Sequence, residues 1–405
     1  MNFEFFFAKK IIKGGNHSFS KPIVRISILA IALGIAMMTL SLTIVEGFQE
    51  QIRDKISGFG AHITIQKFQN RGQYDSNPIS LNRGFIDSLS GIDNIRHIQS
   101  FAYKGAVLKT DEENQAVLLK GVGSDYNWEF FNSYLKDGRL PRIEDSSRSN
   151  EVMISENLAK KLKLSLNDEV LLYFVQQPPR FRKFTITGLY NTGLGEMDDK
   201  VMVGDIKHLQ KLNNWDDRQV GGLEVMLNDF ERMEESMAKI NEQIDYDLAA
   251  TSITESRVDI FNWLELQDVN VVIIIGLLIL VCGIDIISAL LILILEKTRT
   301  IGVLKALGSR DASIRKIFIY HAAYLVISGL IIGNLMGLGI AYLQLEVGFM
   351  KLPQEAYFID RVPIVFSWWK LALLNLGTLA ISILMLIFPS SIIAGIEPVR
   401  SIRFD

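Results

Sequence analysis

The stretch Val269–Ser309 reads VNVVIIIGLLILVCGIDIISALLILILEKTRTIGVLKALGS and decides the fold of the chain. Its first part, Val269–Leu295, is almost entirely apolar. A helix needs about 20 residues, at 1.5 Å each, to cross a bilayer, so this part is long enough to do so. The charged remainder, Glu296–Ser309, begins where the apolar run ends. The stretch therefore predicts a membrane helix that leads directly into a polar surface segment.

The polar segment has the pattern of a short amphipathic helix. Ile301, Leu304 and Leu307 fall on one helical face, with lysines and an arginine around them. Gly308 is suited to end such a helix. We expect an element that either docks into a groove on a partner protein or serves only as a charged turn that fixes membrane topology.

Further apolar runs predict additional membrane helices. They are Ile23–Val45, Ile317–Leu343 and Leu371–Ile393. The first run could also be read as a signal peptide, but it exceeds the 7–15 apolar residues typical of one. The sequence after it, Val45-Glu46-Gly47, is no small-x-small cleavage site. We therefore predict four membrane-spanning helices, of which Val269–Leu295 is the second.

Lysines and arginines are distributed unequally among the segments outside these helices. Among the short segments, the N-terminal segment 1–22, the loop 296–316 and the tail 394–405 together carry twelve, whereas the loop 344–370 has three. Because positively charged short loops stay in the cytoplasm, both termini and the loop 296–316 are predicted to be cytoplasmic. Residues 46–268 are then expected outside the cell membrane, together with the short loop 344–370.

The first thirteen residues, MNFEFFFAKKIIK, place Phe3, Phe6, Phe7 and Lys10 at helical spacing. Such a segment is typical of a helix that lies in the cytoplasmic membrane interface, with its lysines near acidic head groups. We expect an interfacial helix within residues 1–22. A disordered basic tail that only sets topology is the alternative.

Composition agrees with a membrane anchor joined to a water-exposed domain. Of 405 residues, 49% are hydrophobic and 21% charged, and the mean hydropathy is +0.22. A net charge of −3 argues against nucleic-acid binding. The single cysteine, Cys282, and five scattered histidines give no metal-ligand spacing, and the chain has no nucleotide-binding loop. We expect no cofactor, metal or catalytic residue in this chain, so its energy must come from a partner.

Residues 46–268 show strand-like and helix-like patterns in alternation, which predicts an α+β domain with two subdomains. The polar, turn-rich stretch 137–149 marks a boundary, and the second subdomain is expected as an insert at about 137–220. Ser155 is expected to cap a short helix over 156–162.

Asp285 is the unusual residue of the second membrane helix. It lies 11 residues before Glu296, or about 16 Å along the helix, which places it near the middle of the bilayer. An aspartate there costs about 2.5–3.5 kcal/mol, so its side chain should face protein or a wet cavity. We expect a role in a substrate cavity or in helix pairing; the alternative is a protonated, hydrogen-bonded carboxyl without a transport role.

The segment EKTRTIGVLKALGS at 296–309 strongly resembles the signature of ABC-transporter permeases of the FtsX/MacB/LolC-LolE superfamily. Other motifs are similar to those of LolC and LolE: Leu33-Gly-Ile-Ala36, Ile44–Glu50, and the ending with Phe388-Pro-Ser-Ser and Glu397–Asp405. The absence of a fused ATPase and the length of the outer segment favour the LolC/LolE branch.

The resemblance implies a fold of four transmembrane helices with a Porter domain and an inserted Sabre domain between the first two. It implies a multi-pass subunit in the cell inner membrane that releases lipoproteins toward a periplasmic carrier. Its partners would be a dimer of ABC ATPases, which holds the ATP and magnesium, and a second permease, identical or paralogous. The loop 296–316 would couple to the ATPase through Glu296, Lys297, Arg299, Ile301, Gly302, Leu304, Lys305, Leu307 and Gly308.

A carrier-binding hook, as in LolC, would correspond here to residues 176–182, with Gln177, Pro178, Pro179 and Arg180 as contact candidates. Seven residues are short for a protruding hook. A MacB- or FtsX-like permease, which exports a toxic compound or controls a cell-wall hydrolase by mechanotransmission, remains an alternative. A membrane-anchored sensor or adhesion domain without transport is the second alternative.

Overall fold

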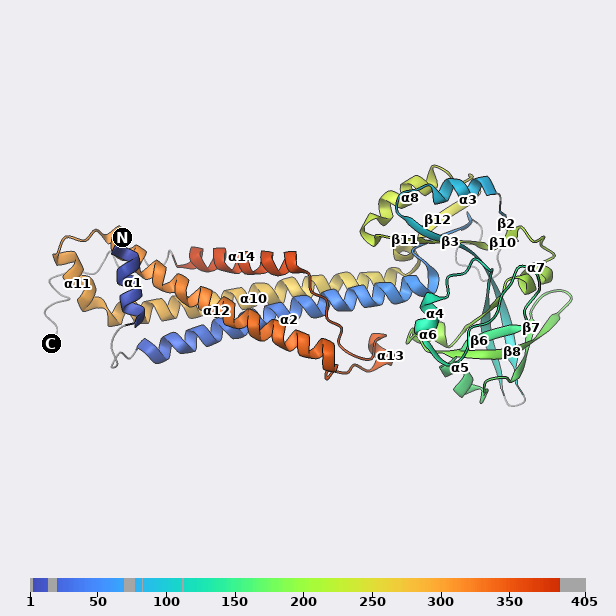
Figure 1. The fold of residues 1–405 in the computed structure, drawn as a ribbon, viewed down its shortest axis with the longest axis horizontal. Coiled ribbons are helices and arrows are strands. Elements are labelled where there is room, and N and C mark those ends of the chain that lie inside the picture. Colours follow the sequence, from blue (N-terminus) through green and yellow to red (C-terminus); the bar gives the residue numbers. More distant parts are fainter. Residues whose placement is uncertain (1–2, 14–19, 69–76, 82, 111–112, 387–405) are drawn as a thin grey trace. The chain divides into compact units, whose positions relative to one another are not determined.

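The computed structural model describes residues 3–13, 20–68, 77–81, 83–110 and 113–386 (Figure 1). The chain divides into two compact units. The helical unit comprises Met1–Glu50, Trp263–Lys351 and Arg361–Asp405, and the α+β domain comprises Gln51–Asn262 and Leu352–Asp360.

In the described part of the chain, four helices are long and apolar enough to cross a membrane. They are α2 (Ser20–Gly60), α10 (Val258–Glu296), α12 (Asp311–Val347) and α14 (Trp368–Met385). The predicted set of four apolar helices is confirmed. Two shorter helices, α1 (Phe3–Lys13) and α11 (Thr298–Ala306), belong to the same unit. Residues 387–393 of the fourth expected helix and the tail 394–405 lie outside the described residues.

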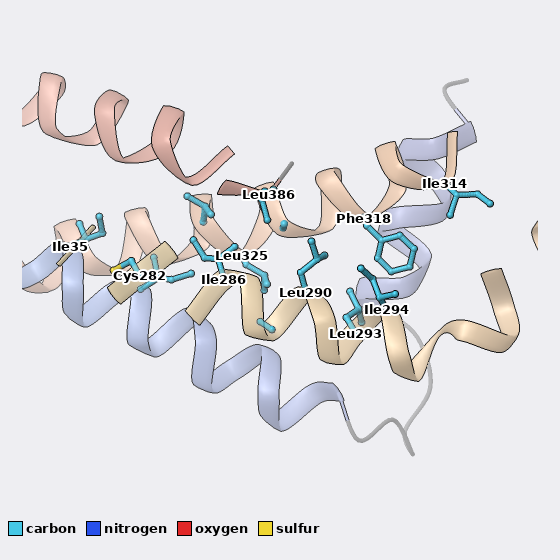
Figure 2. Close-up of a cluster of buried hydrophobic side chains, with 14 of the residues drawn as sticks. Ile35, Cys282, Ile286, Leu290, Leu293, Ile294, Ile314, Phe318, Leu325 and Leu386 are labelled. Carbon is cyan, nitrogen blue, oxygen red and sulfur yellow. The ribbon is translucent and has the colours of Figure 1, made fainter. Parts of the chain in front are cut away.

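The core of the helical unit is a cluster of buried apolar side chains from α2, α10, α11 and α12 (Figure 2). Ile35 of α2, Ile286 and Leu290 of α10, and Phe318 and Leu325 of α12 are all at most 2% exposed. Such dense packing, rather than any difference in polarity from lipid, is what holds helices together in a bilayer.

A row of glycines brings α12 against α2. Gly329, Gly333 and Gly337 recur every fourth residue of α12, so they share one helical face. A Cβ at Gly333 would lie 2.6 Å from the Ala32 carbonyl oxygen, and one at Gly337 would lie 3.0 Å from the Cβ of Thr39. The two helices can approach this closely only because these positions lack side chains.

A pair of asparagines joins α12 to α14. The Asn334 amide donates a hydrogen bond to Asn375 Oδ1 at 2.6 Å, and Asn375 donates one back to Asn334 Oδ1 at 3.2 Å. Each amide also donates to a carbonyl of its own helix, of Leu330 and Leu371 respectively. Reciprocal polar contacts of this kind add specificity to an apolar helix interface.

Glu46, near the end of the helical unit that contains Glu50 and Trp263, is paired with a lysine. Glu46 forms an ion pair with Lys370, which precedes the apolar part of α14, and its side chain is 12% exposed. Gly47 lies against the backbone of Pro363 and Ile364, at 2.9 Å from where its Cβ would be. The acid at position 46 is therefore balanced within the unit.

The α+β domain is built on a mixed, mostly antiparallel sheet of ten strands, in the order β12-β1-β11-β3-β4-β9-β6-β8-β5, with β7 paired to β3 and β8. The strands are β1 (Ile63–Lys67), β3 (Ile95–Lys109), β4 (Asn114–Val122), β5 (Leu135–Gly138), β6 (Glu151–Ser155), β7 (Glu169–Phe174), β8 (Arg180–Tyr190), β9 (Val201–Asp205), β11 (Gly222–Leu227) and β12 (Leu248–Ser252). A separate pair joins β2 (Ile79–Ser80) to β10 (Gln219–Val220).

Helices of the α+β domain are short. They are α3 (Arg83–Ser90), α4 (Glu129–Ser133), α5 (Glu156–Lys161), α6 (Gly195–Asp198), α7 (Lys207–Asn213), α8 (Met233–Asn241), α9 (Ile253–Ser256) and α13 (Gln354–Tyr357), with a 3-10 turn at Phe230–Arg232. Ser155 caps α5, because its hydroxyl accepts a hydrogen bond from the Leu158 amide at 3.0 Å, as predicted.

A buried ion pair fastens the end of α2 to the sheet. The Lys120 ammonium of β4 lies 2.7 Å from Glu224 Oε1 of β11, and both side chains are at most 2% exposed. Lys120 also donates to the Phe59 carbonyl oxygen at 2.9 Å, one of the last carbonyls of α2. Burial alone would lower the pKa of Lys120, but Glu224 and two nearby tyrosines more than offset it and raise that pKa above its usual value.

The glycine row predicts a position-specific stability effect. Gly333→Ala should destabilise the protein by about 1–3 kcal/mol, because the added methyl overlaps the Ala32 carbonyl. Gly339→Ala, on the same helix, meets no atom within 4 Å and should leave stability unchanged or slightly raised. Thermal unfolding of the full-length protein in detergent checks this, and equal melting temperatures for both variants would contradict the packing.

Candidate functional site

The short helix α11 joins α10 to α12 and has one face packed inward. Ile301 is 1% exposed and Gly302 is also buried, and Leu304 packs against the apolar cluster. The start of the helix is tied to α10, because the Thr298 hydroxyl donates to the Ile294 and Leu295 carbonyl oxygens at 3.0 and 2.8 Å. These contacts hold α11 in one orientation on the helical unit.

The end of α11 is fixed equally well. Gly308 adopts a positive φ of 87°, a conformation that favours glycine, and its amide donates to the Lys305 carbonyl oxygen. The predicted helix stop is confirmed. The Lys305 ammonium forms an ion pair with Asp311, the first residue of α12, at 2.9 Å. The turn between α11 and α12 is therefore defined by both backbone and charge.

The outward face of α11 carries an exposed apolar stripe. Leu295 is 72%, Val303 45% and Leu307 78% exposed, and the exposed Arg299 lies between them in sequence. Arg299 and Val303, four residues apart, lie on one side of α11 itself, whereas Leu295 is near the end of α10 and Leu307 directly follows the last residue of α11. The stripe is unlike a merely charged turn, because its most exposed side chains, Leu295 and Leu307, are large and apolar.

The predicted coupling residues thus divide into two groups. Ile301, Gly302 and Leu304 pack inward, whereas Arg299, Leu307 and Gly308 are exposed. Glu296 and Lys297 form an ion pair with each other. The expectation that Ile301, Leu304 and Leu307 share one face is wrong for Leu307, because the helix ends at Ala306 and Leu307 turns outward. Sequence reasoning also missed Val303, although its four-residue spacing with Arg299 was a visible signal, and it missed the exposed Leu295 near the end of α10.

Asp285 faces α2 within the helical unit. The Ser27 hydroxyl of α2, itself 3% exposed, hydrogen bonds to Asp285. One carboxylate oxygen, Oδ2, is buried without a hydrogen-bond partner among the described residues. Cys282, one turn earlier on α10, faces α2 as well, beside Gly34. This aspartate therefore lies at a helix–helix contact.

The hook candidates lie in the loop between β7 and β8. Gln177, Pro178 and Pro179 are exposed, and Arg180 is half-buried. The Arg180 guanidinium donates to the Lys211 and Leu212 carbonyl oxygens at 3.2 and 3.1 Å, at the end of α7. The loop is therefore held against α7. Two large apolar side chains beside it, Val175 and Phe181, are 79% and 61% exposed.

The histidines of the α+β domain have structural surroundings. His208, 1% exposed, hydrogen bonds to the Ser149 carbonyl oxygen at 2.8 Å. His62 Nδ1 accepts a hydrogen bond from the Leu227 amide at 3.2 Å. Burial lowers the pKa of each to about 4, so both are neutral at pH 7. No group of metal-ligating side chains is found in the described ranges.

Comparison with known proteins gives the family. Residues 26–243 match the MacB-like periplasmic core domain, and residues 272–398 match the FtsX-like permease C-terminal domain. This chain is an ABC transporter permease of the FtsX- and MacB-like family. Such a protein is a membrane subunit of a transporter and not itself an enzyme.

Relatives of the permease cover nearly its whole length. It is 22% identical to the lipoprotein-releasing system transmembrane protein LolC of Xylella fastidiosa, over 94% of this chain and 93% of that one. Identity is 23% with LolC of Neisseria meningitidis, over 96% of each chain, and 21% with LolE of Haemophilus influenzae, over 93% of each. Among solved structures it is similar to the periplasmic region of MacB from Actinobacillus actinomycetemcomitans, with 16% identity, 51% and 96% coverage and a TM-score of 0.35.

Substitution by aspartate should affect stability very differently at the buried Ile301 of α11 and at the exposed Leu307 that follows it. Ile301→Asp should destabilise the permease by about 3–5 kcal/mol, because it buries a carboxylate without a partner. Leu307→Asp should change stability by less than about 0.5 kcal/mol, because the side chain is exposed. Melting temperatures of the two full-length variants measure this difference. A large loss for Leu307→Asp would mean that this side chain is packed in the native protein.

Proposed function

We propose that the permease releases lipoproteins from the inner membrane toward a periplasmic carrier, driven by a separate ABC ATPase. In this proposal both termini and α11 are cytoplasmic, and the α+β domain lies in the periplasm. The exposed stripe of α11 is the observation that carries the coupling to an ATPase. The names of the LolC and LolE relatives, which match over almost the whole chain, support lipoproteins as the cargo.

The stripe has the chemistry of a docking element. Val303 and Leu307 offer exposed apolar area for a groove, and Arg299 offers a charge to a carboxylate at its rim. Because α11 is held by Thr298, Lys305 and the buried Ile301, force applied to the stripe would pass to α10 and α12 rather than bend the loop. A rigid docking helix between two membrane helices suits a subunit that transmits a conformational change.

The hairpin loop around Pro178 and Pro179 is the surface we propose for the carrier. Its exposed Val175 and Phe181 give apolar contact area beside the polar Gln177. Arg180 would act by holding the loop on α7. A second permease, identical or paralogous, would complete the transporter, since LolC and LolE relatives match this chain with similar identity.

A mechanotransmission permease for another cargo is the second candidate. The Bacillus subtilis ABC transporter permease YknZ is 23% identical over 94% of each chain, as similar as the LolC and LolE relatives. The two candidates share the ATPase and differ in the cargo.

Purification of the full-length permease from its native membrane, with mass spectrometry of the retained proteins, tests the proposal. A stoichiometric ABC ATPase and co-purified triacylated lipoproteins are expected. Val303→Asp and Leu307→Asp should remove the ATPase, because a buried carboxylate in the docking groove costs more than about 2 kcal/mol. Leu307→Met, the matched control, should retain it. Recovery of an ATPase without lipoproteins would favour the mechanotransmission candidate. If neither the native permease nor any variant retains an ATPase, a membrane-anchored sensor would be favoured.

Asp285→Asn tests whether the intramembrane acid acts through its charge. Asparagine can keep the hydrogen bond with Ser27, so we expect assembly and cargo release to stay within about twofold of the native values. Asp285→Leu, which removes the hydrogen bond, should weaken assembly. Reconstituted release assays on both variants measure this. Loss of release by Asp285→Asn in an intact complex would show that the charge itself is required.

A further inference from the structure

Lys55 lies in the last turns of α2, in the part of that helix that belongs to the α+β domain. Its side chain is buried, with the whole residue 5% exposed. The ammonium donates to the Thr192 carbonyl oxygen at 2.6 Å and to the Phe358 carbonyl oxygen at 2.7 Å. It therefore joins three segments of the chain that are far apart in sequence.

The two acceptors belong to different kinds of segment. Thr192 is in the turn between β8 and α6, and Phe358 is in Leu352–Asp360, the link between α12 and α14. This link is part of the α+β domain, although Lys351 and Arg361 on either side of it belong to the helical unit. Lys55 is one of the residues of the α+β domain that hydrogen bond to this link.

The turn that contains Thr192 is held in a conformation that leaves the Thr192 carbonyl oxygen available to Lys55. Asp198, which is fully buried, accepts hydrogen bonds from the Thr192 amide and hydroxyl at 3.0 and 2.6 Å and from the Gly193 amide at 2.9 Å. The backbone of the turn is thereby fixed. The Thr192 carbonyl oxygen can then accept from Lys55 without a cost in ordering the turn.

The backbone of the link at Phe358 and the side chain of Gln354 also favour contact with the turn that contains Thr192. Phe358 ends α13 with a positive φ of 61°, an uncommon conformation for a bulky residue, and its amide donates to the Gln354 carbonyl oxygen at 2.8 Å. The Gln354 side chain lies over Gly193, whose φ is +77°, and its amide is 3.5 Å from Asn191 Oδ1. A Cβ at Gly193 would overlap Gln354, so the glycine permits the contact.

The order of the helices in the chain relates the contact of Lys55 with the link to the transmission of movement. The helix α11 lies between α10 and α12 in the chain. At its other end α10 continues into the α+β domain, which includes Val258–Asn262, whereas α12 ends at Val347 within the helical unit. Beyond α12, only the link Leu352–Asp360 belongs to the α+β domain. A displacement carried by α12 can reach the α+β domain through this link only while the link stays bound.

We infer that Lys55 is a positioning residue that fastens the link Leu352–Asp360 to the α+β domain, so that α12 and α14 act on that domain together with α2 and α10. The inference rests on the proposed function for the source of the movement, an ATPase on α11. Lys55 touches no cargo in this account. Loss of Lys55 removes two of the hydrogen bonds that hold the link, although the contact of Gln354 with Asn191 remains, and ATP hydrolysis then continues with less cargo released per ATP.

A cross-linking assay on the intact permease tests the contact itself. Asn191→Cys and Gln354→Cys are introduced with Cys282→Ser, which removes the native cysteine, and dibromobimane bridges the pair with a fluorescent product. Lys55→Met should slow bridging about tenfold, as expected for the loss of a charge-assisted hydrogen bond. Lys161→Met, a change at an exposed lysine of α5, is the matched control and should bridge at the native rate. Equal rates for Lys55→Met and the native lysine would overturn the inference, and this readout requires neither ATPase nor cargo.

The coupling consequence is measured on the permease with its co-purified ATPase. Lys55→Met should lower cargo release per ATP hydrolysed about tenfold while ATP hydrolysis itself is kept, and bridging residues 191 and 354 should restore the ratio. A merely structural defect would reduce both activities and would not be rescued by the bridge. If Lys55→Met fails to fold, the bridge between residues 191 and 354 in the protein with native Lys55 still tests the inference. The yield of bridged product should be the same with and without ATP, and cargo release should be undiminished after bridging. A bridge that blocks release would show that the link must detach, which overturns the inference.

Discussion

The structure depends on how α2 ends. A helix that leaves its last carbonyl groups unsatisfied in a protein interior is costly, and α2 has no basic residue in its own last turn. Lys120 supplies the missing donor from β4, and Glu224 keeps that lysine charged in a fully buried site. Replacing only one member of such a pair would leave a buried charge, so the junction between helix and sheet is defined by both residues together. The same turns of α2 carry Lys55, so sheet, helix end and the α12–α14 link meet at one place in the α+β domain.

Within the helical unit, small and polar residues add close approach and specificity to the packing of the apolar core. The glycines of α12 admit α2 to close contact, and the Asn334–Asn375 pair gives α14 a specific partner. Asp285 and Ser27 follow the same rule, because their hydrogen bond joins α10 to α2 and partly compensates a carboxyl group that would be costly in lipid. By contrast, the stripe of α11 is mostly apolar, and its side chains are exposed among the described residues. It is the feature of this unit whose chemistry suits a second protein, which is why the proposed coupling rests on it.

Much of this architecture could be predicted from the sequence, because it is encoded locally. The apolar runs indicate the membrane helices, Gly308 the end of α11, and Ser155 the cap of α5, each from residues a few positions apart. Contacts between distant residues could not be read in this way. Nothing near Lys120 or Lys55 in the sequence indicates that one pairs with Glu224 and the other with Phe358. The outward turn of Leu307 was missed because helical periodicity was extended past the helix end, and the attachment of Arg180 to α7 depends on a strand order that periodicity does not contain.

In the proposed function, an event at α11 reaches the α+β domain. Hydrogen–deuterium exchange on the reconstituted permease–ATPase complex, with and without trapped ATP, tests it most directly. If movement passes from α11 to the α+β domain, ATP changes exchange at the amides of β1 and of Leu352–Asp360, and Leu307→Asp abolishes the change. Exchange differences confined to α11 and the adjoining ends of α10 and α12, with none in the α+β domain, would contradict it.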